Sequence, residues 1–525
     1  MMKRWIALLA FVSLIGAASA KEKITLADTV VISAKRPFSK DRVDERKAIY
    51  EKCVELAGLP AKKVKAHPSS VFFPGSVPAS APRIKKMIAL EHEPVPEHLR
   101  SIVSKLGYSG ARNHTMYSTG LYAAPGEIIT VTVPDELKGK ISVQIGCHSD
   151  NLNTWVAAKE DWRRMPMIVN SRGLTDKKNT IASAFGGLIY ITCSPAADSF
   201  SGNIDIENAV AAPHFILGKT TNEEWAEMIK NAAAPWGEFE GNGIIITIST
   251  ESLKQITDPE DKAATWDIIV GACYDLAQIP TPFFRKQRIV SDVHIGGGFM
   301  HSGYPIMAHH CPEKRMVSED VIADPDKLMQ PSNGGANWGF FHEIGHNMQN
   351  VTDWVFSGTT EVSVNFFSIY IFDQVLRGRD GAHSGISMTE TRKMMDRYFK
   401  EGTKFEDWQA SPFLGLITFR QIQTDFGWDA FKKVFRRFNE EHRMDMNPER
   451  RGGRNNNMTD EERKAAREQA NQKKIDDLVT YFSDATGYNM MSFFTTWGIP
   501  VSESVASEVE KYPVWMPYNF PPKFK

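Results

Sequence analysis

The chain has 525 residues, with 62 Lys and Arg, 63 Asp and Glu, and a formal net charge of -1. Apolar residues make up 42% and charged residues 24%, which excludes a disordered chain, a coiled coil and a collagen-like fibre. The length predicts about two to four domains. The balanced charge gives no reason to expect nucleic acid as a partner.

The first twenty residues have the order of a secretory signal peptide. Lys3 and Arg4 precede an apolar run over 5–17, and residues 18–20 (Ala-Ser-Ala) form a small-residue cleavage site. The run is shorter than the span of about 20 residues that crosses a membrane, and an uncleaved N-terminal anchor is the alternative. We expect cleavage after Ala20 and a secreted protein, extracellular or periplasmic, without a membrane anchor.

Five cysteines without a Cys-x-x-Cys pair exclude a disulfide scaffold and a cysteine-rich zinc site. Cys147 and Cys193 each end a strand-like run, so one bridge between them fits an oxidising compartment. Unpaired buried thiols fit the pattern equally well.

Residues 21–110 are expected to form an N-terminal segment of helical and extended parts. A helix is predicted over about 41–59. The proline-punctuated stretch 67–96 is interpreted as a tether that wraps over another domain, because Pro removes a backbone donor and resists regular structure.

Short β-rich runs separated by Gly, Pro and Asp predict an antiparallel, sandwich-like domain over 111–220. The clearest runs lie at 128–133, 141–145 and 188–191.

Helical segments and strands alternate from 220 to 300, and the rest of the chain is mainly helical. We assign 221–420 to one domain and 421–525 to a C-terminal helical subdomain. The fold class is therefore α+β and multidomain, with a mainly helical part after the β-sandwich-like domain. The charged stretch 440–477 is expected to be a solvated loop and helix face.

Residues 342–346 read His-Glu-Ile-Gly-His, which matches the His-Glu-x-x-His pattern. On a helix the imidazoles of His342 and His346 lie one turn apart on the same face, as binding of one Zn²⁺ requires, and Glu343 lies close to the metal's water. Chance gives about 0.02 such matches in a chain of this composition. Two histidines on an ordinary helix are the alternative.

A catalytic zinc needs a third protein ligand and an open position. Thr352 stands where a metzincin has its third histidine, and the acidic candidates are Asp353 and Glu361. Glu361 fits better, because it opens a second amphipathic helix beside the first in the two-helix arrangement of a gluzincin; helix capping is its alternative role. Asn365, one turn on, is placed to hydrogen-bond a ligand from the second shell.

Several motifs together resemble the M60 (enhancin-like) metallopeptidases. The resemblance rests on His342–Gln349 and on Gly358-x-x-Glu361-x-x-x-Asn365, and it extends to 119–122, 125–127, 186–190, 301–306, 426–428 and 497–500. It covers roughly 110–500. It implies that His342, His346 and Glu361 hold one zinc ion per chain, that Glu343 is catalytic and that 221–420 is the peptidase domain.

The resemblance also implies a substrate class. M60 peptidases of host-associated bacteria include mucin O-glycopeptidases, which cleave the peptide bond before a glycosylated Ser or Thr. We therefore expect O-glycosylated, mucin-like glycoproteins as substrates, and a monomer as the default oligomeric state.

Some residues near the motif are candidates for substrate binding. Trp338 and Trp354 flank it and are candidates for stacking on a sugar, with burial in the core as the alternative. The glycine-rich stretch 295–304 is a candidate edge strand on which a substrate peptide pairs. His301 and Tyr304 are candidates for lining the cleft or steadying the oxyanion, with ordinary loop positions as the alternative.

Three functions are compatible with these patterns. The first is a zinc-dependent O-glycopeptidase in which Glu343 acts as the general base on a zinc-activated water. The second is an M60-like protease without a glycan requirement. The third is a non-catalytic carbohydrate-binding surface protein.

Overall fold

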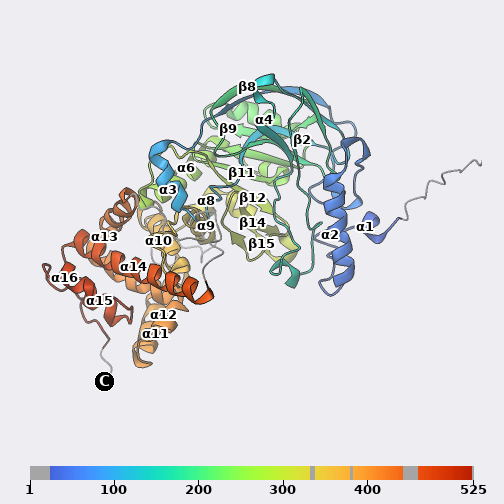
Figure 1. Cartoon of the computed structure of the whole chain (residues 1–525). Coiled ribbons are helices and arrows are strands. Elements are labelled where there is room, and N and C mark those ends of the chain that lie inside the picture. Colours follow the sequence, from blue (N-terminus) through green and yellow to red (C-terminus); the bar gives the residue numbers. More distant parts are fainter. Residues whose placement is uncertain (1–23, 332–336, 379–381, 442–458, 523–525) are drawn as a thin grey trace, which may run out of the picture.

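The computed structural model describes residues 24–331, 337–378, 382–441 and 459–522 (Figure 1). The expected signal peptide, residues 1–20, lies outside this part of the chain.

The N-terminal segment begins with α1 (Leu26–Thr29) and α2 (Val43–Gly58), and α2 corresponds to the helix predicted over about 41–59. Both helices lie at one side of the molecule (Figure 1). The guanidinium of Arg46 in α2 lies 4.0 Å from the ring centroid of Trp162, which is fully buried. This cation–π contact covers the apolar ring of Trp162 and places the guanidinium of Arg46 over the face of that ring.

The first sheet contains eight strands in the order β5-β4-β7-β2-β8-β3-β6, with β1 also paired to β8. All neighbouring strands are antiparallel. Their bounds are β1 (Ile84–His92), β2 (Thr115–Ala123), β3 (Ile129–Thr132), β4 (Ile141–Ile145), β5 (Asn170–Gly173), β6 (Lys178–Ile181), β7 (Gly187–Cys193) and β8 (Phe200–Ala211).

Strand β1 corrects the interpretation of 67–96 as a tether. Its residues pair with β8 from Ile84 opposite Ala209 to His92 opposite Phe200. The prolines that suggested a tether flank this strand on both sides and do not interrupt its ladder. The sheet therefore begins upstream of the expected start at 111.

The first sheet folds over on itself around one core. Val131 of β3 and Val143 of β4 are buried in the same cluster although their strands lie far apart in the sheet order. Strand β2 joins the two halves: it meets β8 at Leu121 and Tyr122, and it pairs with β7 on both sides of a register shift between Ser118 and Tyr122. Gly120, with φ +64°, supplies the bend between them.

The five cysteines are free and buried. Sγ of Cys193 lies 3.4 Å from Nδ1 of His92, and Sγ of Cys147 lies 3.7 Å from Nδ1 of His148. The bridge considered between Cys147 and Cys193 is therefore not formed, and the alternative of separate buried thiols holds.

The second sheet contains seven strands in the order β13-β14-β12-β11-β10-β9, with β15 paired to β14. Strands β11, β12 and β14 run parallel, and α6 makes the crossover from β11 to β12. The bounds are β9 (His214–Ile216), β10 (Trp236–Glu240), β11 (Ile244–Ser249), β12 (Gln287–Asp292), β13 (Met300–His301), β14 (Ile306–Cys311) and β15 (Met316–Val317).

Alternate residues of the second sheet face different layers, as the pleat of a strand requires. Ile289 belongs to the core that contains α6 and α9, whereas Val290 belongs to a core shared with Tyr190 of the first sheet. The second sheet thus lies between the first sheet and the helices (Figure 1).

The C-terminal part is helical and packs on this second sheet. The remaining helices are α3 (Glu97–Lys105), α4 (Asn222–Lys230), α5 (Thr250–Leu253), α6 (Pro259–Ala277), α7 (Ser318–Ile322), α8 (Pro325–Leu328), α9 (Trp338–Met348), α10 (Thr360–Gln374), α11 (Met388–Lys400), α12 (Phe405–Gln409), α13 (Pro412–Glu440), α14 (Asp460–Thr486), α15 (Met491–Thr496) and α16 (Ser504–Val509). None of the helices in the described ranges has the length and apolarity of a membrane span.

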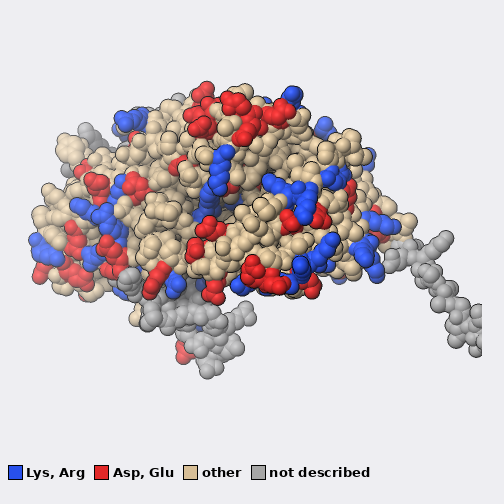
Figure 2. All heavy atoms as spheres, turned by 90° about the horizontal axis from the view of Figure 1, so that it is seen from above, with Lys and Arg blue, Asp and Glu red and all other residues tan. Residues whose placement is uncertain are grey.

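Acidic and basic side chains are interspersed over the face of the molecule seen in Figure 2. This mixed pattern gives that face no broad basic surface of the kind that nucleic acids bind.

Helices α9 and α10 approach each other closely at Gly345. A Cβ atom at Gly345 would lie 2.8 Å from Cβ of Phe367, which is fully buried in α10. Only a residue without a side chain fits there, so Gly345 sets the distance between the two helices.

We predict that Gly345→Ala destabilises the fold by about 1–3 kcal/mol, because the added methyl group overpacks the contact with Phe367. The control is Gly271→Ala in α6, where a Cβ would meet nothing within 4 Å and where Ala favours the helix. Urea unfolding of both variants measures the difference. Equal stability of the two variants would contradict a tight contact at Gly345.

Candidate metal centre

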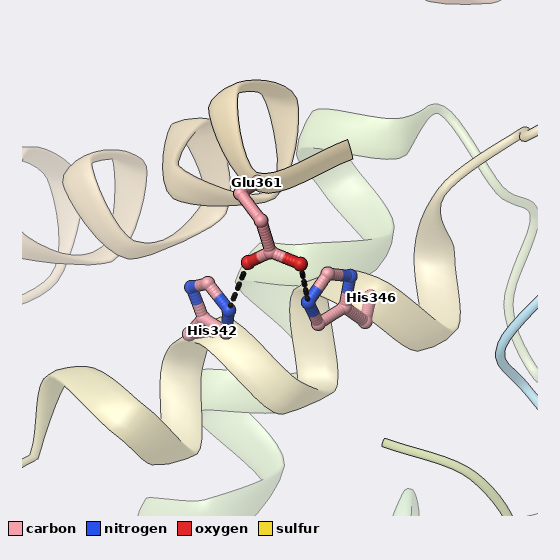
Figure 3. A group of neighbouring side chains, drawn as sticks. All are labelled: His342, His346 and Glu361. Carbon is pink, nitrogen blue, oxygen red and sulfur yellow. Dashed lines mark ion pairs between the residues drawn. The ribbon is translucent and has the colours of Figure 1, made fainter. Parts of the chain in front are cut away.

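Two imidazoles and one carboxylate converge between α9 and α10 (Figure 3). Nε2 of His342 lies 3.2 Å from Oε2 of Glu361, and Nε2 of His346 lies 3.6 Å from Oε1. The two histidines are one turn apart on the same face of α9, and Glu361 lies in the first turn of α10. One ligand atom from each residue can be chosen so that all lie within 4.8 Å of one another.

The ring of His342 is oriented by Asn365. Oδ1 of Asn365 accepts hydrogen bonds from Nδ1 of His342 (2.9 Å) and from Nε1 of Trp338 (3.2 Å). Because the indole can only donate, this oxygen is the acceptor for both, and His342 carries its proton on Nδ1. In the neutral ring Nε2 is then the unprotonated nitrogen, which is the atom that can bind a metal ion.

The ring of His346 is oriented in the same way by Gln349. Nδ1 of His346 lies 2.6 Å from Oε1 of Gln349, whose Nε2 donates to the carbonyl of Thr360 and to Oγ of Ser363, both at 2.8 Å. Gln349 therefore ties the end of α9 to the start of α10. The sequence motif contains Gln349, but its spacing alone did not indicate this role.

The other acidic candidate, Asp353, points elsewhere. Its Oδ2 lies 2.8 Å from Nζ of Lys105 in a buried ion pair, and it also accepts from Nδ2 of Asn350 at 2.9 Å. Asp353 is thus part of the packing between α3 and the loop after α9.

The donor set and its spacing fit a zinc ion. Tetrahedral ligands about 2.0–2.2 Å from zinc lie about 3.4 Å from one another. The two nitrogen–oxygen separations at Glu361, 3.2 and 3.6 Å, bracket this value. The side chain of Glu361 is 52% exposed, so the group opens to solvent on one side, where a water or substrate has access.

The charges of this group shift the pKa values of its carboxyls in opposite directions. In the absence of a metal ion, hydrogen bonds from the protonated rings of His342 and His346 hold the pKa of Glu361 far below its usual range. Burial raises the pKa of Glu343, and the neighbouring histidines only partly offset that effect. Glu361 is therefore an anion suited to bind a cation, and Glu343 has the affinity for a proton that a general base needs.

His301 lies in β13, at the edge of the second sheet. Its Nε2 lies 2.8 Å from Oδ2 of Asp150, and its Nδ1 lies 3.0 Å from the carbonyl oxygen of Ser302. Burial lowers the pKa of His301, but the hydrogen bond and charge of Asp150 outweigh it and raise the pKa to about 9. Both ring nitrogens are therefore engaged as donors, which leaves none for an oxyanion.

Three other predicted substrate contacts are buried. The indole of Trp338 is 5% exposed, packs near His383 and donates to Asn365, so it supports the side chain that orients His342. Trp354 stacks on Phe435. Tyr304 is 8% exposed and lies under the guanidinium of Arg285, 3.6 Å from its ring centroid. The burial of these residues favours the alternative of a packing role.

Tyr108 lies at the centre but was not among the candidates from the sequence. Its ring centroid is 4.9 Å from that of His346, and the residue is 37% exposed. No local pattern marks this position, because it precedes the first-sheet strand β2 and reaches the centre only through the tertiary fold.

The comparisons with known proteins agree with this architecture. Residues 208–498, more than half of the chain, match the family described as Peptidase M60, enhancin and enhancin-like. Residues 99–207 match the N-terminal domain of M60-like peptidases.

A curated relative is TRPM8 channel-associated factor 3 of Rattus norvegicus, 34% identical over 410 residues. The match covers 78% of this chain and 40% of the relative, so the chain spans less than half of that protein's length.

Two solved structures share the fold. IMPa from Pseudomonas aeruginosa, in complex with an O-glycopeptide, has a TM-score of 0.57 at 14% identity, covering 91% of this chain and 62% of that one. The ZmpB metallopeptidase from Clostridium perfringens has a TM-score of 0.55 at 17% identity, covering 81% and 80%.

Helices α9 and α10 lie in the region that matches the peptidase family, and strands β2 to β7 of the first sheet lie in the region that matches the N-terminal domain. This chain belongs to the M60 family of enhancin and enhancin-like peptidases, and it carries the N-terminal domain of that family ahead of the peptidase domain.

Proposed function

We propose that the protein is a zinc-dependent endopeptidase that cleaves O-glycosylated, mucin-type proteins on the N-terminal side of a glycosylated Ser or Thr. The observation that carries the proposal is the convergence of His342, His346 and Glu361, with the buried carboxyl of Glu343 on the same helix. One zinc ion per chain is proposed to bind these three side chains.

In this mechanism zinc, when bound, supplies a polarised water and a Lewis acid for the scissile carbonyl. His342 and His346 present Nε2 because Asn365 and Gln349 engage their Nδ1 atoms. Glu343 takes the proton of the attacking water and delivers it to the nitrogen of the leaving amine. Burial favours this exchange, because it raises the pKa of the Glu343 carboxyl toward neutral pH.

The glycan requirement rests on similarity of fold. IMPa, one of the proteins with this fold, is described in complex with an O-glycopeptide and with T-antigen. The fold that this chain shares with IMPa, at 14% sequence identity, supports O-glycosylated proteins as the substrate class here. Which sugars are accepted is a question for experiment. The proposed enzyme acts as a secreted monomer, outside the cytoplasm.

Two alternatives are tested by the same experiments. The rat relative is named for association with a channel, which favours binding without cleavage as a second function. An M60 peptidase without a glycan requirement is the other alternative. Substitution of Glu343 tests the alternative of binding without cleavage, because only a catalytic protein loses an activity. Removal of the sugars from the substrate tests the alternative of a peptidase without a glycan requirement.

We predict that Glu343→Gln lowers kcat by at least about 10³-fold and retains one zinc ion per chain, because the substitution removes the base and leaves the three ligands in place. Cleavage of an O-glycosylated peptide by mass spectrometry, together with metal analysis, measures both effects. Unchanged cleavage by this variant would end the proposal of catalysis by Glu343.

We predict that Asn365→Ala weakens zinc binding by about 10–100-fold, because His342 loses the acceptor that fixes its ring. Asn365→Asp is the matched control, since its carboxylate still accepts from His342 and Trp338. Competition with a zinc-binding dye measures the affinity. Equal zinc affinity in the Ala variant and the wild type would show that Asn365 does not orient the ligand.

We predict that mucin is shortened only while its O-glycans are present and zinc is available. Gels of native and enzymatically deglycosylated mucin, each with and without a chelator, provide the measurement. Degradation of both forms would favour a protease without a glycan requirement. Binding of mucin without any shortening would favour the non-catalytic alternative.

A further inference from the structure

We propose that the hydroxyl of Tyr108 donates the hydrogen bond that stabilises the oxyanion formed during peptide cleavage. This inference rests on the proposed peptidase function, and it names the oxyanion donor that the proposed mechanism does not identify. Tyr108 lies in the region that matches the N-terminal domain, so the active site would be completed from outside the peptidase domain.

The position of Tyr108 fits this role. It belongs to the link between α3 and β2, and its ring lies against the imidazole of His346 with the centroids 4.9 Å apart. The residue is 37% exposed, on a centre that also opens to solvent at Glu361. A phenol at such a place has a donor available to a substrate that binds beside the metal ligands.

The backbone before Tyr108 is held firmly against the loop after α9. Nζ of Lys105, 2% exposed, pairs with Asp353 at 2.8 Å and donates to two backbone carbonyls at the end of α13, each at 2.9 Å. The amide of Val351 donates to the carbonyl of Lys105 at 3.1 Å. A Cβ at Gly107 would lie 2.4 Å from Val351, so only glycine permits this approach.

The backbone after Tyr108 is held by Arg285. The buried guanidinium of Arg285 donates to the carbonyls of Ser109 (3.0 Å) and Asn113 (2.9 Å) and lies over the ring of Tyr304. Burial of a guanidinium is costly unless its donors are satisfied, and here loop carbonyls satisfy them. Arg285 and Tyr304 thus act together as a support for the segment that carries Tyr108.

Other polar side chains near the centre have their donors engaged. Both ring nitrogens of His301 are hydrogen-bonded, and the amide nitrogens of Asn365 and Gln349 donate to the backbone of α10. The hydroxyl oxygen of Tyr304 accepts a hydrogen bond from the backbone amide of Met116 at 3.3 Å, and the residue is only 8% exposed, so burial keeps this hydroxyl from the open side of the centre. The ring of Tyr108 contacts His346, one of the proposed zinc ligands. Within the described ranges the hydroxyl of Tyr108 has no hydrogen-bond partner.

The proposed step conserves charge and protons. When the water oxygen bonds to the carbonyl carbon, Glu343 receives the water proton and the carbonyl π electrons move to the oxygen. The hydroxyl of Tyr108 donates a hydrogen bond to that oxyanion and keeps its own proton. When the carbon–nitrogen bond breaks, its electron pair goes to the nitrogen, which takes the proton from Glu343 as the carbonyl re-forms.

The test is Tyr108→Phe, which keeps the ring beside His346 and removes only the hydroxyl. We expect kcat on an O-glycosylated peptide to fall about 10²–10³-fold, with KM changed less than about threefold and zinc content unchanged. Tyr518→Phe, at a position 93% exposed, is the control and should retain wild-type kinetics.

A second readout is binding of a zinc-loaded protein to a phosphinic peptide, whose tetrahedral oxyanion mimics the intermediate. Calorimetry should give a Kd weakened by the same factor as kcat in Tyr108→Phe, since the hydroxyl acts on the transition state. Unchanged kcat and unchanged Kd in this variant would overturn the inference and leave the proposed function standing. A wild-type protein that binds the phosphinic peptide but cleaves nothing would count against the proposed function alone, and the two Kd values would still decide the role of Tyr108.

Discussion

The contact between α9 and α10 at Gly345 is the constraint on which the rest of the site depends. Without a side chain there, Phe367 packs directly on α9, and the first turn of α10 brings Glu361 to the Nε2 atoms of both histidines. A carboxylate this close to two imidazoles has an unusually low proton affinity, and an anion between two nitrogen donors is a natural cation ligand.

The two matched domains contribute jointly to this arrangement. Polar contacts cross between them: Lys105 forms a buried ion pair with Asp353, and Asp150 holds the partly exposed His301 at the edge strand. Buried charges of this kind add little stability, but they fix a geometry because breaking one partner away leaves the other unsatisfied. The region that matches the N-terminal domain is therefore part of the structure that shapes the centre.

Local patterns in the sequence predicted the elements that depend on neighbouring residues. The helix α2, the runs of the first sheet and the helical spacing of His342 and His346 all follow from periodicity. Strand β1 was missed because its flanking prolines suggested a tether. The roles of Trp338 and Tyr108 could not be assigned from the sequence, because both depend on the tertiary fold. Residues distant along the chain bury Trp338, and the fold brings the partly exposed Tyr108 to His346.

We propose that three side chains from two helices bind a single zinc ion. An anomalous difference map at the zinc absorption edge, from crystals of the full chain grown with zinc, tests it most directly. We expect one peak about 2.0–2.2 Å from Nε2 of His342, Nε2 of His346 and a carboxylate oxygen of Glu361. A peak bound by other residues, or a zinc-supplied crystal with no peak between α9 and α10, would contradict it.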